Sequence, residues 1–311
     1  MKKLVLLLSL ALPALLNAQN RQATETVAAT IKPVQNIEIA DGERAFSKGT
    51  FASYQFTIPQ AYLKDVSKDW QKYIKSGSKN KPVEANGETS MLGAVNKNVS
   101  GSTFDIYSTL VETTDGVRLT AWLVGPDSVY ISKAVNTDRD LAAQKYLHDF
   151  AVQEYKDAVS RELKQQQDGL KALEDNLKEF IKEEEKSNQK IKENERSIDR
   201  QKNAITASLN DQKNKADQIG AQKKVVEQQK AISEDAAKDA AKVQKGYEKE
   251  LKQLEKNHEK LSKEIDKWEA DIREEGRNIE KSKQNQRWKN DSIEKQKLVI
   301  KAVEEKLAAI K

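Results

Sequence analysis

The chain has 311 residues, of which 33% are charged, yet its formal net charge is only +5 because 54 Lys and Arg nearly offset 49 Asp and Glu. The two signs are interleaved, as in residues 248–267, whereas a nucleic-acid-binding protein concentrates positive charge on one face. We therefore expect no nucleic-acid partner. The absence of cysteine excludes disulfides and thiolate metal sites.

Residues 1–18 have the form of a secretory signal peptide. Lys2 and Lys3 supply the positive start, Leu4 to Leu16 form an apolar run, and cleavage is expected after Ala18. This run is shorter than the about twenty residues that a membrane-spanning helix needs, and no later stretch is longer. We expect an exported protein, periplasmic or extracellular, without a membrane span.

Residues 19–48 are polar and show no sustained period, which predicts an extended arm. Residues 49–136 are different, because here apolar residues alternate with polar ones and turn residues recur. The alternation predicts strands over 51–58, 103–112 and 117–124, and a short edge strand at 129–131. A hairpin about Asn86-Gly87 and a tight turn at residues 113–116, whose Asp-Gly pair suits positive φ angles, connect the strands.

A helix is predicted over residues 60–75, because apolar residues recur there at spacings of three and four. A strand, a helix and then several antiparallel strands together indicate a small α+β head with helices on one face of its sheet. At the junction, Thr137 and Asp140 have the spacing of a capping box, which predicts the start of a long helix. Its first part, residues 139–160, has a broad apolar face that includes Leu141 and Phe150, so we expect it to pack on the head.

Residues 137–311 are predicted to form a long coiled coil. No proline follows Pro126, and mostly apolar residues recur every seventh position in two series. The companion position, three residues along, is often polar, which indicates a seam of moderate stability. The two series start at Leu163 and Leu251; they run through 170, 177, 184, 191, 198, 205, 212, 219 and 226, and through 258, 265, 272, 279, 286, 293, 300 and 307.

A single chain buries both stripes if the coiled coil is an antiparallel hairpin. The best reversal lies near residues 233–246, where Ser233 resembles a helix cap. Reversals near Asn210-Asp211 or Asn290-Asp291-Ser292 are alternatives that would make a bundle of shorter helices. A continuous helix would instead need a second copy of the chain, which would make the protein a homo-oligomer through its coiled coil.

The sequence contains no catalytic, cofactor-binding or metal-binding motif. The two histidines, His148 and His258, are expected to lie on the docking helix and on the seam. The run Glu183-Glu184-Glu185 points in several directions on a helix and forms no pocket. Trp268 and Trp288 are interpreted as seam and surface packing. We expect a protein that is not an enzyme and needs no cofactor.

Three loose motifs carry a resemblance to known proteins. They are SKG and FTIP within residues 47–59, TAWLVG at 120–125, and DFAVQEYKDAVSRELK at 149–164. With the leader, they resemble a group of exported bacterial proteins that have a small α+β head and a Lys/Glu-rich coiled-coil tail. The coiled coil is also similar to that of periplasmic activators of cell-wall amidases, and to the helical hairpins of OmpH-type chaperones. The first resemblance implies no activity.

These features favour a non-enzymatic structural or interaction protein of the bacterial cell envelope. The head is then the recognition module for a protein partner, and the coiled coil is a spacer or an assembly surface. Two alternatives stay open. The first is a periplasmic holdase chaperone that binds unfolded clients between weakly associated helices, and the second is a coiled-coil regulator of cell-wall hydrolases.

Overall fold

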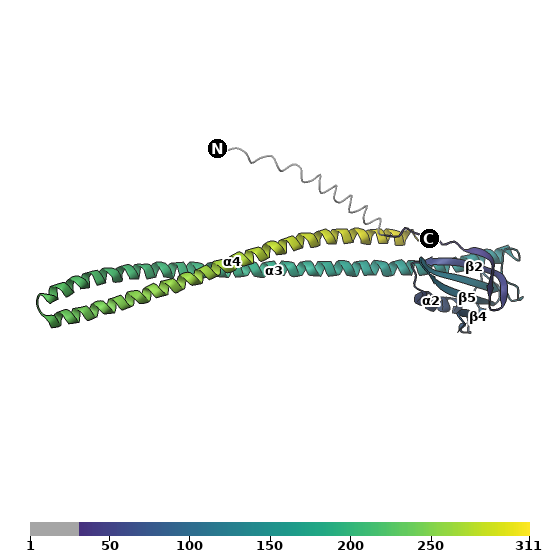
Figure 1. Ribbon diagram of the computed structural model, residues 1–311. Helices are drawn as coiled ribbons and strands as arrows, with labels where there is room; N and C mark the ends of the chain where they lie inside the picture. Colours follow the sequence, from purple (N-terminus) through teal and green to yellow (C-terminus); the bar gives the residue numbers. More distant parts are fainter. Residues whose placement is uncertain (1–30) are drawn as a thin grey trace, which may run out of the picture. The chain divides into compact units, whose positions relative to one another are not determined.

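The computed structural model describes residues 31–311, so the predicted signal peptide and the first part of the arm lie outside the described residues. The described chain forms an antiparallel sheet with helices, followed by a hairpin of two long helices (Figure 1). This confirms the predicted fold class. The described chain divides into two compact units: the first contains the residues from 31 to Ala172 together with Ile293–Lys311, and the second is Leu173–Ser292.

The sheet of the first unit has six antiparallel strands in the order β1-β2-β6-β5-β4-β3. Four of its five pairings join strands that follow one another in sequence, and the pairing of β2 with β6 completes the sheet. The strands predicted over 51–58, 103–112 and 117–124 and both predicted hairpins are confirmed. The bounds are β1 Ala40–Phe46, β2 Gly49–Pro59, β3 Val83–Ala85, β4 Glu88–Ala94, β5 Phe104–Thr113 and β6 Gly116–Val124.

Alternation determines which face of each strand is buried. In β2, Tyr54, Phe56 and Ile58 are at most 3% exposed and belong to the main apolar core, while the residues between them face the other way. In β6, Leu119 and Leu123 join the same core. The helices cover this face of the sheet.

Each of the two predicted hairpin turns of the head contains a glycine with a positive φ angle. Asn86 and Gly87 both have positive φ, as the predicted tight turn requires. At residues 113–116 only Gly116 has a positive φ, so the expected positive φ at Asp115 is wrong. A Cβ on Gly116 would lie 2.0 Å from the Ile58 carbonyl oxygen, so the close approach of β2 to this turn requires glycine.

The strand β1 corrects the expectation of an extended arm over residues 19–48. It pairs with β2 along its whole length and forms one edge of the sheet. Its Asp41, Gly42 and Glu43 are exposed, and an edge strand with charged residues has no apolar alternation to reveal it. The edge strand expected at residues 129–131 is reduced to a single bridge between Val124 and Tyr130.

Helix α2 (Leu63–Lys75) is confirmed, but it begins three residues later than the expected start at Gln60. Gln60 has a φ of 59°, which is outside the right-handed helical region. The buried stripe consists of Val66, Trp70 and Ile74, which recur at a spacing of four and pack against the sheet.

Helix α3 (Thr137–Lys230) begins one residue earlier than the proposed cap implies, because its cap is Asn136 and not Thr137. The Asn136 side-chain oxygen accepts a hydrogen bond from the Arg139 N–H at 2.9 Å. The Asp140 side chain does not bond back to the Thr137 backbone N–H, as the predicted capping box would require. Instead, this side chain is buried and accepts a hydrogen bond from the Tyr54 hydroxyl at 2.7 Å, which ties the helix start to β2.

The base of α3 packs on the sheet, as the sequence predicted for residues 139–160. Its buried residues Leu147, Phe150 and Tyr155 belong to the main core, whereas Leu141 is 60% exposed and was wrongly assigned to the buried face. The core also contains Val303 and Ile310 from the end of helix α4 (Glu234–Ala309) and the residue after it. The sequence did not predict that the last residues of the chain complete the core of the head.

A buried ion pair accompanies this apolar contact. Lys306 is 5% exposed, its ammonium group donates to the Gln60 side-chain oxygen, and it lies 3.4 Å from a Glu162 carboxylate oxygen. A buried charge is tolerated only when it has such partners. The end of α4 is therefore held on both α3 and the β2–α2 connection.

In the second unit, the reversal occupies Ala231 to Ser233, at the start of the predicted range. The Ser233 hydroxyl accepts the Ala236 N–H at 3.2 Å and caps α4, as its position suggested. The alternative reversals at Asn210-Asp211 and Asn290-Asp291-Ser292 are wrong, because these residues lie inside the long helices.

The seam between the two helices follows the predicted heptads. In the second unit, the residues of both heptad series, and the residues three positions after them, are less exposed than the residues around them. Partners across the seam keep one register: Gln222 contacts Ala240, the Lys215 ammonium lies over the Tyr247 ring, and Ser282 donates to the Phe180 carbonyl. In this register Ser187 of α3 lies opposite Glu275 of α4. This layer of the seam therefore has a polar residue from each helix. Lys190 approaches the same Glu275 at 2.7 Å.

We predict that spin labels on Arg200→Cys and Lys263→Cys, in this chain that otherwise has no cysteine, are about 20–25 Å apart in a single molecule. Both positions are exposed and nearly level in the register, and packed helix axes are about 8–10 Å apart. Pulsed electron paramagnetic resonance measures the distance. A continuous helix would separate the sites by about 95 Å and would contradict the hairpin.

Candidate functional site

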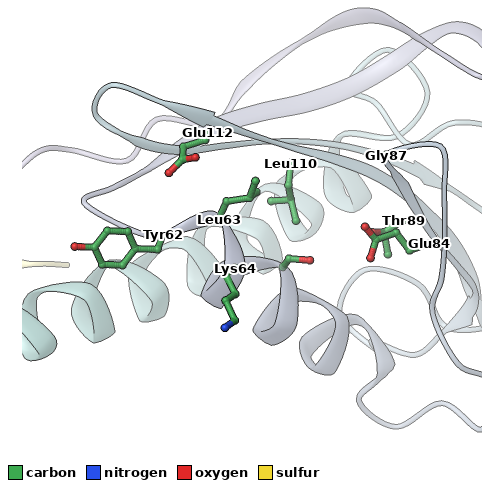
Figure 2. Close-up of a pocket in the computed structure, with 9 residues that line it drawn as sticks. Tyr62, Leu63, Lys64, Glu84, Gly87, Thr89, Leu110 and Glu112 are labelled. Carbon is green, nitrogen blue, oxygen red and sulfur yellow. The ribbon is translucent and has the colours of Figure 1, made fainter.

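A groove of about 620 Å³ opens on the head between α2 and the strands β3, β4 and β5 (Figure 2). All of its residues belong to the first unit. The first turn and a half of α2 form one wall, and the strands with the β3–β4 turn form the other. The lining residues are Tyr62, Leu63, Lys64, Ser67, Glu84, Gly87, Thr89, Leu110 and Glu112.

The middle of the groove is apolar. Leu63 and Leu110 are partly buried and pack against the main core, and Figure 2 shows both between the two ends of the groove. Tyr62, just before α2, is 59% exposed. An aromatic ring left this exposed beside two leucines forms an apolar surface that the head itself does not cover.

The floor of the groove is held by buried hydrogen bonds. The Trp70 indole N–H donates to the Ser108 hydroxyl at 2.8 Å, and that hydroxyl lies 3.3 Å from the Thr89 carbonyl oxygen, to which it donates. Trp70 and Ser108 are at most 1% exposed. These bonds connect α2 to β5 and β4 through a satisfied polar chain, so the groove has rigid walls.

Two carboxylates lie at opposite ends of the groove. Figure 2 shows Glu112 at one end and Glu84 at the other. Glu84 accepts one hydrogen bond, from the Gln71 side chain at 3.2 Å. Within residues 31–311 the side chains of Glu112 and Lys64 have no hydrogen bond or ion pair, so the head leaves the charges of the groove largely unneutralised.

The opposite face of the sheet has an aromatic cluster, formed by Phe46, Phe51, Tyr107, Trp122 and Tyr130. Phe46 stacks on Trp122 with ring centroids 4.6 Å apart, and Phe51 stacks on Tyr130 at 4.1 Å. Trp122 is 2% exposed and Tyr107 is 8% exposed, so the cluster is a second small core and not an open platform.

The β1–β2 turn closes over this cluster. Ser47 donates its backbone N–H and its hydroxyl to the two Glu88 carboxylate oxygens of β4, at 2.8 and 2.5 Å. The Lys48 ammonium donates to the Tyr107 hydroxyl at 2.6 Å, and this bond raises the Lys48 pKa. The aromatic face is therefore occupied by the chain itself.

An isolated acid is buried between α2 and α3. Glu154 is 3% exposed, and its Oε2 has no hydrogen-bond partner among the described residues. Burial and, to a smaller extent, the charges of Asp69, Asp157 and Asp65 raise the Glu154 pKa to about 7, against the opposing charge of Arg161. Glu154 therefore changes charge near neutral pH inside the head.

No site residue was predicted from the sequence. His148 is partly buried on the base of α3, and His258 is partly buried on the seam of α4. Trp268 is partly buried on the seam, whereas Trp288 is 71% exposed. Within residues 31–311, no three His, Asp or Glu side chains converge as a metal site.

The groove was not predicted from the sequence, because its residues come from three separate stretches of the chain, 62–67, 84–89 and 110–112, and form no motif. The only local signal was the Asn86-Gly87 turn, which predicted the β3–β4 hairpin but not its position beside α2. No helix within residues 31–311 combines the length and the apolar character that crossing a bilayer requires.

Comparison of the chain with family models, with curated proteins and with solved structures found no match.

We predict that Glu154→Gln makes the head more stable at pH 8 than the unchanged chain, and that this gain shrinks towards pH 4.5. The folded state keeps the Glu154 proton up to a pH of about 7, whereas the unfolded chain loses it near 4.5, so the free energy of unfolding falls as the pH rises through this range. The shift corresponds to at most about 3 kcal/mol.

Urea unfolding of the full chain, followed by near-ultraviolet circular dichroism, measures this difference at both pH values. The matched control is Asp149→Asn, which changes an exposed acid on the same helix and should give no pH-dependent gain. An equal gain at pH 4.5 and pH 8 for Glu154→Gln would contradict the raised pKa.

Proposed function

We propose that this chain is a non-enzymatic interaction protein of the bacterial cell envelope, whose head recognises a protein partner. The observation that carries the proposal is the groove beside α2, which has rigid walls, an exposed tyrosine and, at one end, a Glu112 carboxylate that has no side-chain hydrogen bond or ion pair within residues 31–311. A surface with these properties suits binding, because its apolar area and its charges are both available to another molecule.

The location in the cell envelope is part of this proposal. It rests on the positive start and the apolar run of residues 1–16, followed by Ala18, which are typical of a secretory signal peptide. Export to the periplasm or the extracellular space would also be compatible with a chain that has no cysteine, since its fold needs no disulfide.

The hairpin is proposed to act as a spacer or an assembly surface. Its two apolar stripes are paired within one chain, so its seam needs no second subunit. Its outer surface has exposed residues of both charge signs, with ion pairs such as Lys263–Glu259. Such pairs keep a helix surface hydrated and contribute little to stability. A homo-oligomer formed through the coiled coil would have to use these outer faces.

We predict that the double substitution Glu84→Lys with Glu112→Lys abolishes the binding of protein partners. The tagged, full-length protein is crosslinked in envelope extracts, and the proteins recovered with it are compared between the unchanged chain and the variant. The substitutions reverse both charges of the groove at exposed positions, so the fold should be retained. The matched control is Asp41→Lys with Glu43→Lys on the exposed edge strand β1, which makes the same change of charge elsewhere on the head. Quantitative mass spectrometry of the recovered proteins is the readout.

A shortened hairpin provides the second control for this experiment. Deleting residues 191–204 and 258–271 removes two heptads from each helix and preserves the register. If the head recognises the partner, the shortened protein recovers it as the full chain does. Recovery that survives the groove substitutions but is lost in the shortened protein would assign recognition to the hairpin.

A holdase chaperone is the second candidate, and one feature of the seam favours it. The Ser187–Glu275 layer is polar on both helices, and further along the seam the Ser208 hydroxyl and the Gln212 side-chain nitrogen are buried without hydrogen-bond partners. Buried polar atoms without partners weaken the contact between the helices. A weakened seam is suited to opening around an unfolded client.

For the holdase candidate we predict that Ser187→Leu with Glu275→Leu reduces the suppression of aggregation of an unfolded outer-membrane protein. An apolar layer tightens the seam, since it buries more apolar surface. The control Glu274→Leu changes the neighbouring, exposed carboxylate. Light scattering at several-fold molar excess of the protein measures suppression. Absence of suppression by the unchanged protein removes this candidate.

A further inference from the structure

We propose that the groove binds an extended peptide segment in which an apolar residue lies between two basic residues, at positions i, i+2 and i+4. This rests on the proposed role of the head in recognition and adds the chemistry of the partner. The groove presents three matching features in one line: a carboxylate, an apolar centre and a second carboxylate (Figure 2).

The apolar centre accepts one side chain. Leu63 from α2 and Leu110 from β5 face each other across the groove, and both are supported from below by the main core. Tyr62 adds an exposed ring to the same wall. A leucine-sized side chain placed here would remove apolar surface from water on both molecules without moving the walls.

The charges select the residues that flank the apolar one. Glu84 and Glu112 outnumber the single cation of the groove, Lys64, and Glu112 has no ion pair within the described chain. Two lysine or arginine side chains would each meet a carboxylate. An acidic segment would instead face repulsion at both ends, so the groove discriminates by charge.

The spacing follows from the sheet register. Glu112 lies four residues beyond Ser108 on β5, and Ser108 aligns with Thr89 on β4 and then with Glu84 on β3. At about 3.3 Å per residue and about 4.8 Å between strands, the Cα atoms of Glu84 and Glu112 are about 16 Å apart.

In an extended segment the Cα atoms of residues i and i+4 are about 13 Å apart. Long basic side chains at these two positions span the remaining distance to the two carboxylates. In an extended chain, residues i, i+2 and i+4 project from one face, so all three can enter the groove together. In a helical segment residues i and i+4 are only about 6 Å apart, so their side chains would have to stretch across the remaining distance of about 10 Å. The extended form leaves only about 3 Å to span and therefore fits the groove better.

The test uses the full-length protein and fluorescently labelled acetyl-Lys-Ser-Leu-Ser-Lys-amide, with fluorescence anisotropy as the readout. We expect saturable binding that weakens at high salt, because exposed charges are screened. Binding should weaken about tenfold or more in Glu84→Lys with Glu112→Lys, since both ion pairs become repulsive. It should be unchanged in Asp41→Lys with Glu43→Lys.

Two further peptides separate charge from pattern. Acetyl-Glu-Ser-Leu-Ser-Glu-amide should not bind, and acetyl-Ser-Ser-Leu-Lys-Lys-amide, with the same composition as the first peptide, should bind clearly more weakly. Equal binding of the two lysine peptides, or no binding of the first, overturns the proposed pattern. Circular dichroism of each variant confirms that the head is folded.

The outcome is independent of the partner experiment above. If the groove substitutions remove envelope partners while the patterned peptide binds no better than its shuffled form, the proposed recognition role survives and this inference fails. If the patterned peptide binds in the groove but no partner depends on Glu84 and Glu112, the binding chemistry is supported and the cellular role fails.

Discussion

Aromatic packing between α2 and the base of α3 is the interaction on which the rest of the structure depends. Trp70 lies 4.8 Å from Phe150 between ring centroids, and Tyr73 lies 5.0 Å from the same ring. The Tyr73 hydroxyl donates to the Tyr146 carbonyl at 2.8 Å, and burial raises the Tyr73 pKa to about 12. These contacts hold both helices on one face of the sheet, and so they also position the α2 wall of the groove.

The two long helices serve different purposes in the two units. In the first unit they are part of a globular core, because α3 supplies Leu147 and Phe150, and Val303 comes from α4. In the second unit the two helices pack only against each other, and the seam between them contains both apolar and polar layers. Burial of apolar area is therefore concentrated in the head, while register in the hairpin depends on polar contacts such as Lys190–Glu275.

The two faces of the sheet show why one is a better candidate for binding. The aromatic face is closed by the β1–β2 turn through Ser47 and Lys48, so its rings already have partners. In the groove on the other face, the Glu112 carboxylate has no hydrogen bond or ion pair within residues 31–311, and Tyr62 is largely exposed. A surface whose polar and apolar groups are unsatisfied gains more from a ligand than one whose groups are already paired.

Local patterns in the sequence were sufficient for the period-two strands, the Asn86-Gly87 turn, the heptads and the Ser233 reversal, because each depends on residues close in the chain. The α+β head with a helical hairpin follows from those elements. The edge strand β1, the return of Val303 and Ile310 to the head, and the buried Lys306 were decided only by the tertiary structure. The groove belongs to this second group. Glu84, Leu63 and Glu112 line one groove only when the sheet register and α2 are assembled, and no short-range periodicity in the sequence encodes that arrangement.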